Sequence, residues 1–364
     1  MVPKIQAVDL FCGAGGLTRG LLDAGITVKA GVDLNKECEF AYTYNNEGTV
    51  FINKSVTDLS GNDINKHFSS GGLKLLCGCA PCQTFSTMNR RNKETRKKDS
   101  RWTLLLEFRR LLLETLPDLV SMENVPGLLS TDVFQEFTEA LSIAGYYFDY
   151  KVLDCSKYGM PQKRNRLVLV ASRLGEISIP AAEELCLPDA SVRSCIGNLP
   201  RITAGETFCD DPLHTASSLS EANLNRIKAS KPGGSWRDWN KELLLACHER
   251  KRGKGYGAVY GRMEWEKPSP TITTQFYNYG SGRFGHPEQD RALSLREGAL
   301  LQGFPASYKF YDSKHPIGKR SLGVMIGNAV PVGLARIIGD IFVSHVDKHS
   351  LLNMAAGTSH SVIR

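Results

Sequence analysis

The chain has 364 residues, 41% of them hydrophobic and 23% charged, and its 45 lysines and arginines exceed its 38 aspartates and glutamates by a net charge of +7. This composition is typical of an ordinary soluble protein with one large core and a smaller second domain. It excludes the secreted and membrane-spanning classes, since no signal peptide or transmembrane run is evident. The modest positive charge suits a nucleic-acid partner, and ten cysteines without paired spacing indicate thiols in a reducing compartment.

The first predicted element is a buried parallel strand over residues 5–11, which leads into the glycine-rich turn Cys12–Gly16 and then a helix. Glycine permits backbone conformations and a close ligand approach that a side chain would block. The next strand, residues 27–32, ends at Asp33, twenty residues after Gly13, where a carboxylate can hold ribose hydroxyls. The pattern predicts a nucleoside cofactor. No Gly-Lys-Ser/Thr follows as in a phosphate loop, and the Gly-x-Gly-x-x-Gly spacing of a dinucleotide site is missing.

Two further strand-like runs, residues 73–77 and 117–122, end near one cysteine and one glutamate. Cys82 lies in a Pro-Cys-Gln turn after the first run, and Glu123 follows the second. Ligand sites of open α/β sheets lie at the carboxyl ends of strands, so both residues can face one crevice. The pair suggests a thiolate nucleophile working with a carboxylic acid. Taken alone, Cys82 would most often be a small buried thiol, and Glu123 would most often be a solvated carboxylate at a strand end.

Two stretches invite comparison with metal sites. Cys77-x-Cys79-x-x-Cys82 could supply zinc ligands, but no second paired cluster follows at a suitable spacing. His248-Glu249 has no second histidine four residues later. We therefore expect no metal.

Motifs along nearly the whole chain resemble, in the usual order, those of the cytosine-C5 DNA methyltransferase family. The motifs are Asp9–Leu17 for the cofactor turn, Pro81-Cys82-Gln83 for the nucleophile, Glu123-Asn124-Val125 for the acid, Gln162–Arg166, Arg296-Glu297 with Leu301–Pro305, and Gly327–Pro331. Two departures are visible. Leu34 replaces the aromatic residue often found at the adenine, and Cys79-Ala80 stands where Gly-Phe or Gly-Pro is common.

The resemblance implies an α/β, Rossmann-like, S-adenosylmethionine-dependent methyltransferase domain with a smaller, loop-rich target-recognition domain. Its activity would be methylation of carbon 5 of a flipped cytosine within a short specific DNA sequence. Cys82 would add to carbon 6, and Glu123 would bond and transiently protonate ring nitrogen 3. Arg166 would bond the cytosine carbonyl oxygen, and Arg164 would support the site near the nucleophile. The base that removes the carbon 5 proton is not evident, and without the other motifs these arginines would be a solvated strand edge.

The resemblance also implies how the cofactor S-adenosylmethionine, with S-adenosylhomocysteine as product, is held. Asp33 would bind the ribose, Leu34 would pack on the adenine and Asp58 would meet it. The full set of expected cofactor residues is Phe11, Cys12, Gly13, Ala14, Gly16, Leu17, Asp33, Leu34, Asp58, Leu59, Pro81, Leu104, Asn328 and Val330.

We expect the catalytic domain over residues 1–185, completed by 321–350, the target-recognition domain over 186–320, and a frayed tail over 351–364. A basic loop over 83–101 is expected to close over the DNA backbone, and Trp236 and Trp239 are expected in a small core. Recognition-domain side chains would distinguish base pairs in the major groove. The expected DNA contacts are Gln83, Ser86, Arg90, Arg91, Arg96, Lys97, Arg250, Lys251, Arg252 and Arg283.

Three alternatives remain open: a transfer RNA cytosine-5 methyltransferase, a non-catalytic DNA-binding relative, and a nicotinamide oxidoreductase. The 129 residues between Arg166 and Arg296 favour a DNA recognition lobe, and intact Cys82 and Glu123 favour activity. The expected partner is double-stranded DNA, without a membrane. We expect a monomer in the cytoplasm of a bacterial or phage-infected cell, acting beside a separate restriction endonuclease or as an orphan methylase. The sequence does not give the bases recognised.

Overall fold

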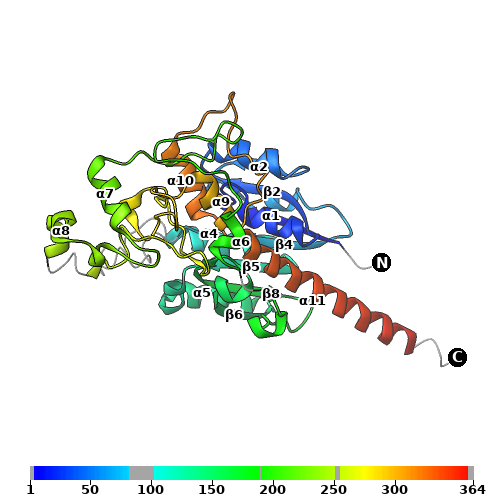
Figure 1. The fold of residues 1–364 in the computed structure, drawn as a ribbon. Helices are drawn as coiled ribbons and strands as arrows, with labels where there is room; N and C mark the ends of the chain where they lie inside the picture. The colour runs from blue at the N-terminus through cyan, green and yellow to red at the C-terminus, as the bar shows by residue number, and fades with distance from the viewer. Residues whose placement is uncertain (1–3, 82–101, 189, 251–254, 360–364) are drawn as a thin grey trace. The chain divides into compact units, whose positions relative to one another are not determined.

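The computed structural model describes residues 4–81, 102–188, 190–250 and 255–359 (Figure 1). The chain forms two compact units. The first comprises Met1–Asp154, Asn165–Leu185 and Val330–Arg364, and the second comprises Cys155–Arg164 and Cys186–Ala329. The chain therefore enters the second unit twice and returns at its end to the first.

The first unit is built on a seven-stranded sheet with the strand order β3-β2-β1-β4-β5-β8-β6. The strands from β3 to β5 are parallel, and β8 runs antiparallel to both of its neighbours. Strands β1 and β5 are buried along their whole length, as inner strands of a sheet covered on both faces should be. The bounds are β1 Ile5–Leu10, β2 Thr27–Asp33, β3 Val50–Asn53, β4 Leu73–Gly78, β5 Leu119–Asn124, β6 Tyr147–Asp154 and β8 Asn165–Ser172.

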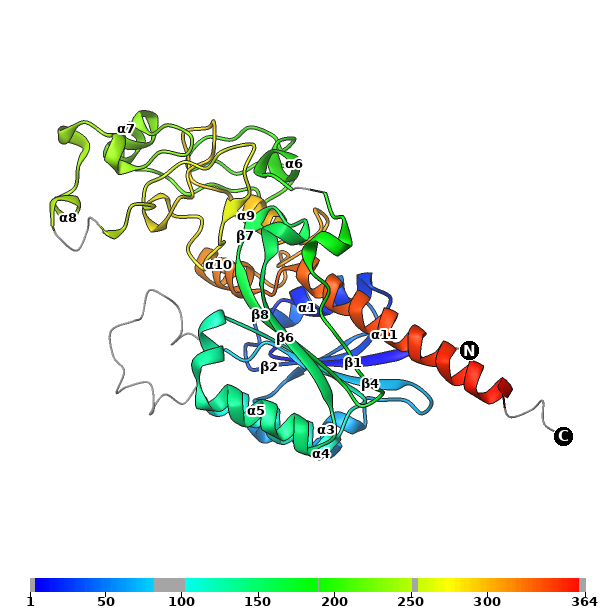
Figure 2. The ribbon, with the colours of Figure 1, turned by 90° about the horizontal axis from the view of Figure 1, so that it is seen from below.

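Helices cover both faces of this sheet, with α3, α4 and α5 on one side and α1 and α11 on the other (Figure 2). Phe108 of α4 and Phe137 of α5 belong to the large core against the first face. On the second face α1 and α11 approach each other closely at Gly20. A Cβ at this position would lie only 2.4 Å from the Ala335 Cβ, so the contact requires glycine. The helices are α1 Gly16–Asp23, α2 Cys38–Asn45, α3 Gly61–Asn65, α4 Trp102–Thr115, α5 Asp132–Ile143 and α11 Val332–Ser359.

The strand order places a topological switch between β1 and β4. From β1 the chain continues outward to β2 and β3, whereas β4 and β5 extend the sheet in the other direction. Open α/β sheets bind ligands at the carboxyl ends of the strands beside such a switch. The turn after β1 and the segment Cys79–Pro81 after β4 both lie there.

One helical stretch of the described residues, Lys319–Leu351, is long and apolar enough to cross a membrane by length and composition. Its most apolar window has a mean hydropathy of 1.6, but 72% of that window is buried inside the protein. Core helices of soluble proteins have the same properties, so this is weak evidence for a membrane span.

The second unit is mostly irregular, with short helices and one two-stranded pairing of β7 and β9. Its apolar core contains Trp236 and Trp239, which are 8% and 7% exposed, together with Tyr279 and Ile227. The expectation that both tryptophans are core residues is confirmed. Its strands and α-helices are β7 Gln162–Lys163, β9 Ser269–Pro270, α6 Val192–Ile196, α7 Glu221–Ala229, α8 Ala246–Glu249, α9 Leu295–Leu301 and α10 Lys319–Asn328.

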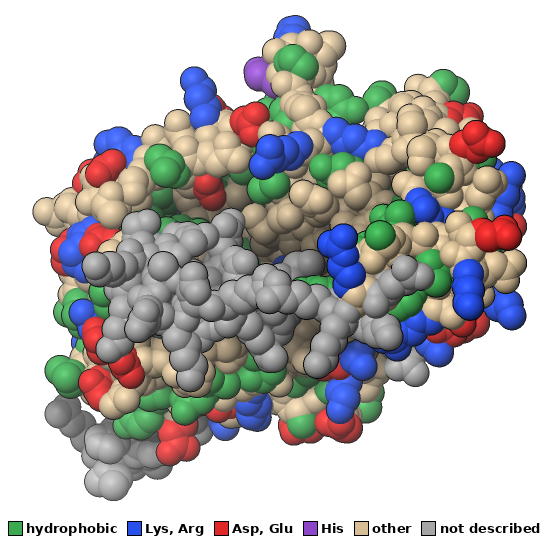
Figure 3. Space-filling model, turned by 90° about the vertical axis from the view of Figure 1, so that its left-hand side faces the viewer, with side chains coloured by type: hydrophobic (Ala, Val, Ile, Leu, Met, Phe, Trp, Pro, Cys, Tyr) green, Lys and Arg blue, Asp and Glu red, His purple; other side chains and the backbone are tan. Residues whose placement is uncertain are grey.

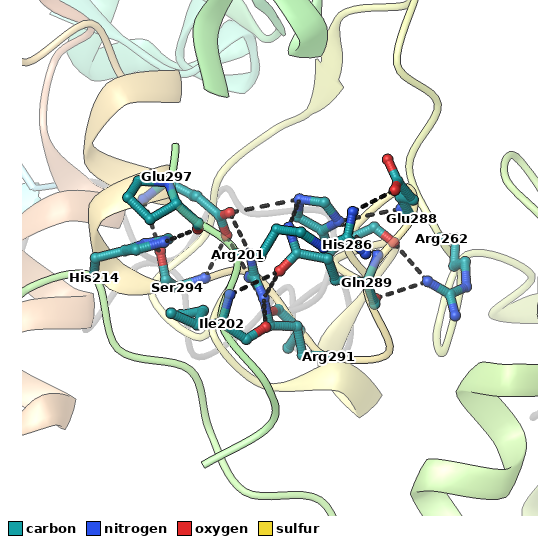
Figure 4. A network of polar contacts seen from close by, with 12 residues as sticks. Arg201, Ile202, His214, Arg262, His286, Glu288, Gln289, Arg291, Ser294 and Glu297 are labelled. Atoms are coloured by element: carbon teal, nitrogen blue, oxygen red, sulfur yellow. Dashed lines mark hydrogen bonds and ion pairs between the residues drawn. The ribbon is translucent and has the colours of Figure 1, made fainter. Parts of the chain in front are cut away.

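A buried polar network also stabilises the second unit (Figure 4). Arg291 is fully buried and donates two hydrogen bonds of 2.7 Å to the Glu297 carboxylate. Glu297 also accepts the backbone N–H of Ser294 at 2.7 Å, which caps helix α9. Burial raises the pKa of Glu297, but the Arg291 hydrogen bonds and charge outweigh it and lower the pKa to about 2. The buried ion pair between Arg291 and Glu297 therefore helps to hold together a unit that has little β-sheet.

Candidate active site

The turn after β1 has a left-handed backbone at three of its residues. Phe11 has φ 62°, Gly13 has φ 51° and Gly15 has φ 92°. The strand thus ends at Leu10, one residue earlier than the sequence indicated, because Phe11 leaves the extended conformation. A Cβ at Gly13 would meet nothing within 4 Å. The glycine therefore leaves space beside the backbone, as a bound ligand requires.

Asp33 at the end of β2 braces this turn. Its Oδ2 accepts the Gly13 N–H at 2.8 Å, and its Oδ1 accepts the Asn35 N–H at 2.8 Å. Burial raises the pKa of Asp33, and these backbone hydrogen bonds act in the opposite direction. Each oxygen keeps a second lone pair for a ligand hydroxyl. The next side chain, Leu34, is 73% exposed, so an apolar surface lies beside the acid.

A buried cluster that the sequence did not indicate lies beneath the turn. The Thr18 hydroxyl donates to Asp9 Oδ2 at 2.7 Å and lies 3.1 Å from the Tyr42 hydroxyl. Burial raises the pKa of Asp9 to about 7. The Tyr42 ring fills the space that a Cβ at Gly31 would occupy. These contacts join residues 9 to 24 positions apart, which no local sequence pattern reports.

Glu123 lies inside the last part of β5, not after the strand, and only 2% of it is exposed. Arg166 comes from β8, whose antiparallel pairing with β5 sets Asn124 against Leu167. The Arg166 Nε is 2.8 Å from Glu123 Oε1, an ion-pair distance at which the N–H is not aligned for a hydrogen bond. The sheet therefore brings together the predicted acid and one predicted arginine.

The segment after β4 is tied to both neighbouring strand ends. The Cys79 N–H donates to Leu10 O at 3.3 Å, and Asn124 Nδ2 donates to Ala80 O at 3.0 Å. The Cys79 thiol also lies against Glu123, with Sγ 2.7 Å from Oε2. The sequence did not assign Cys79 a role. The exposed Pro81 ends the described part of this segment, next to Cys82.

Two other thiols near the turn are poor nucleophiles. Burial raises the pKa of Cys12 and of Cys77 well above the usual value. The thiolate is the reactive form, so neither competes with Cys82 for that role. In the described part of the chain, no group of three or more His, Cys, Asp or Glu could hold a metal ion.

The remaining predicted cofactor residues are placed as follows. Asp58 is exposed at the end of the short helix Val56–Asp58, and Leu59 beside it is buried. Leu104 of α4 packs against the large core. Val330 is buried in the first unit, and Asn328 is exposed at the end of α10 in the second. Ala14, Gly16 and Leu17 are buried at the start of α1.

The second predicted arginine, Arg164, belongs to the second unit and is buried there. Its Nη1 donates to Ile272 O at 2.9 Å, and its Nη2 donates to Gly327 O at 3.3 Å. Gln162 lies beside it, with Oε1 3.4 Å from Nη1. Through these contacts Arg164 links segments of the second unit that are far apart in the sequence.

Many of the expected DNA contacts lie outside the described residues. Arg250 is described and exposed. Arg283 is partly buried, and its guanidinium donates to the carbonyls of Gly233 and Gly234, the latter at 2.7 Å. The predicted residues outside the described ranges are Cys82, Gln83, Ser86, Arg90, Arg91, Arg96, Lys97, Lys251 and Arg252.

The sheet order, the glycine turn after β1 and the acidic end of β2 define a Rossmann-like methyltransferase domain. The chain matches the family model for C-5 cytosine-specific DNA methylases over residues 5–343 and belongs to that family. It is a DNA (cytosine-5)-methyltransferase, an enzyme class that uses S-adenosylmethionine.

The chain is also similar to individual proteins. It is 47% identical to the type II methylase M.HgiDII of Herpetosiphon aurantiacus over 337 residues, which cover 91% of this chain and 93% of that protein. It is 32% identical to the type II methyltransferase M1.BsuMI of Bacillus subtilis, covering 92% and 79%. A prophage-encoded chain of E. coli, described as a DNA modification methyltransferase, has a TM-score of 0.71 at 21% identity, covering 94% and 99%. At that identity the structural likeness shows the fold alone.

Proposed function

We propose that Cys82 and Glu123 carry the methylation of cytosine, with Arg166 holding the acid. The observation that supports this most directly is the set of contacts at the end of β5. There the nearly buried Glu123 carboxylate lies 2.8 Å from Arg166 Nε, and Asn124 is bonded to the segment that leads to Cys82. A carboxylate removed from water and matched by one cation is suited to proton transfer at a ring nitrogen.

In this mechanism the Cys82 sulfur, as thiolate, forms a bond to carbon 6 of a cytosine turned out of the duplex. Electron density moves to carbon 5 while Glu123 protonates ring nitrogen 3. S-adenosylmethionine, when bound, supplies the methyl group that carbon 5 takes up. Loss of the carbon 5 proton and of the nitrogen 3 proton then accompanies release of the Cys82 sulfur. Arg166 holds Glu123 in place by its charge and bonds the cytosine carbonyl oxygen.

We assign the cofactor to the carboxyl ends of β1 and β2. The open space at Gly13 fits a close ligand approach, and the two oxygens of Asp33 fit ribose hydroxyls. Leu34 offers its exposed apolar side chain to the adenine. The arrangement of these residues fits S-adenosylmethionine, and we assign Asp58 as the acid that meets the adenine.

The first unit is proposed as the catalytic domain and the second as the target-recognition domain, with double-stranded DNA as substrate. On the face shown in Figure 3, Lys and Arg side chains are interspersed with Asp and Glu. A mixed surface of this kind favours specific contacts over adhesion to any polyanion. The type II DNA methylases among the relatives favour DNA over the transfer RNA alternative.

The same relatives suggest a setting. As a monomeric enzyme of the bacterial cytoplasm, the protein would modify the sites of a cognate restriction endonuclease that acts separately. An orphan methylase is the second candidate. A gene for an endonuclease of matching specificity in the same genome would decide between them.

The test is to incubate the purified protein with S-adenosylmethionine and unmethylated genomic DNA and to map 5-methylcytosine at single-base resolution. Methylation confined to one short motif is expected. The Cys82→Ser variant should transfer no methyl group while keeping its cofactor affinity. Full turnover by that variant would remove Cys82 as the nucleophile, and unmodified DNA with the wild-type enzyme would point back to transfer RNA.

A further inference from the structure

The thiol of Cys79 contacts the carboxylate proposed as the catalytic acid. Its Sγ lies 2.7 Å from Glu123 Oε2, while Arg166 Nε lies 2.8 Å from the other oxygen, Oε1. In this contact the Cys79 thiol is the donor and Glu123 Oε2 the acceptor. Glu123 is therefore held at both oxygens by two different kinds of partner.

The two partners constrain Glu123 differently. Arg166 supplies a charge, but among the described residues no donor is aligned for a hydrogen bond to Oε1. A charge at this distance holds the carboxylate in place without fixing the rotation of its plane. The directional contact is the one from Cys79 to Oε2. Oε1 faces the Arg166 charge but accepts no aligned hydrogen bond from the described residues, so it is the oxygen we assign to the ring nitrogen.

The position of Cys79 itself does not depend on its side chain. Its backbone N–H donates to Leu10 O, and the next residue, Ala80, accepts from the Asn124 amide. These two bonds fix the segment after β4 whatever side chain stands at position 79. Removing the thiol should therefore change the surroundings of Glu123 and leave the backbone in place.

Position 79 departs from the residue that is common in the family's motif. The sequence motif has Cys79 where glycine is common, and glycine has no side chain to offer Glu123.

We propose that Cys79 is a positioning residue that orients Glu123 toward ring nitrogen 3 of the cytosine. The inference rests on the proposed role of Glu123 as the acid. Within three residues, then, two cysteines have opposite tasks. Cys82 must lose its proton to attack, and Cys79 must keep its proton to donate.

The test is the single-turnover rate of methyl transfer at saturating cofactor and DNA. Cys79→Ala should slow transfer about tenfold, the effect of losing one hydrogen bond to a charged group. Cys79→Ser keeps a donor and should restore most of the rate. Both variants should retain the wild-type cofactor affinity and thermal midpoint. In a Cys79→Ala/Glu123→Gln double variant the effects should not add, because Cys79 acts through Glu123.

A matched control is Cys77→Ala, which removes a thiol from the same strand end. That thiol donates to the backbone carbonyl of Val8 at 3.4 Å and does not contact Glu123. Its removal should leave the transfer rate unchanged.

Three results would overturn the inference. Wild-type transfer by Cys79→Ala, together with slow transfer by Glu123→Gln, would refute the role of Cys79 and leave the proposed function intact. A loss of rate accompanied by lost cofactor affinity or thermal stability, or an equal loss in Cys77→Ala, would show that Cys79 is merely structural. Wild-type transfer by Glu123→Gln would refute the acid itself, and the Cys79 inference would fail with it.

Discussion

Asp33 both stabilises the turn after β1 and is the residue proposed to bind the ribose of the cofactor. Its two oxygens each accept a backbone N–H, from Gly13 and from Asn35, both at 2.8 Å. The Asn53 side chain fixes the same strand end by donating to Asp33 O at 3.1 Å and Leu34 O at 3.0 Å. The acid is therefore held in one orientation before any ligand arrives, and preorganisation of this kind strengthens binding.

Asp33→Ala should weaken S-adenosylmethionine binding about 10- to 100-fold, since it removes the acceptors of the ribose hydroxyls. Calorimetric titration of the purified variant measures the change. Glu37→Ala, which removes an exposed carboxylate four residues away, is the control and should bind as the wild type does. Unchanged affinity in Asp33→Ala would refute the ribose assignment.

The sequence indicated some of these residues and not others, for a physical reason. Asp33 and Glu123 follow strand-like apolar runs, and position relative to a strand end is a local property. The contact of Cys79 with Glu123 joins residues 44 positions apart, and the bond between Thr18 and Asp9 depends on how α1 packs on β1. Contacts of this kind exist only after the sheet has formed.

Among the elements, the parallel strands β1, β2, β4 and β5 could be predicted from their largely apolar runs, whereas the short, partly exposed strand β3 was not predicted. The direction of β8 could not be, since an apolar run has the same pattern in either direction. That direction matters, because antiparallel pairing of β8 with β5 brings Arg166 to Glu123. For the second unit, the sequence predicted a loop-rich domain but not the positions of its short helices. Its order comes partly from the buried pair of Arg291 and Glu297. The spacing Ser294-x-x-Glu297 indicates a helix cap, but no local pattern indicates that Arg291 pairs with Glu297.

Arg291→Met should destabilise the second unit by about 3–5 kcal/mol at neutral pH, because it leaves the buried Glu297 carboxylate without its guanidinium. The native pKa of Glu297, about 2, lies below the ordinary glutamate value of 4.5, so the pair contributes stability above about pH 4.5 that is lost as the pH falls toward 2. The difference between wild type and variant should shrink over that range.

Thermal unfolding at several pH values measures this difference. Arg193→Met provides the comparison, because Arg193 forms an exposed ion pair with Glu266 in the same unit. Exposed pairs contribute at most about 1 kcal/mol, so this variant should unfold close to the wild-type temperature. An Arg291→Met protein as stable as the wild type would show that the buried pair is not what orders the unit.

At the scale of the whole molecule, the proposed function divides between two units of different construction. The first has a covered sheet whose strand ends fix the reacting groups, and the second has irregular backbone stabilised by tryptophans and buried polar groups. Methyl transfer requires the reacting groups to be held in fixed positions, and the strand ends of a sheet hold them so. Recognition of a base sequence requires side chains presented from loops, and loops on a stable scaffold commonly serve that purpose.

The net charge of +7 in 364 residues is modestly basic, and contacts of lysine and arginine with phosphates would make DNA binding depend on salt. If exposed Arg250 contacts a phosphate, Arg250→Ala should weaken binding uniformly across sequences and reduce the slope of log affinity against log salt by about 1. Fluorescence titration of a labelled duplex at several salt concentrations measures this slope. Lys348→Ala removes an equally exposed charge from α11 of the first unit and should leave the slope unchanged. A wild-type slope in Arg250→Ala would exclude a phosphate contact there, whereas a loss of affinity for the methylated motif alone would make Arg250 a reader of bases.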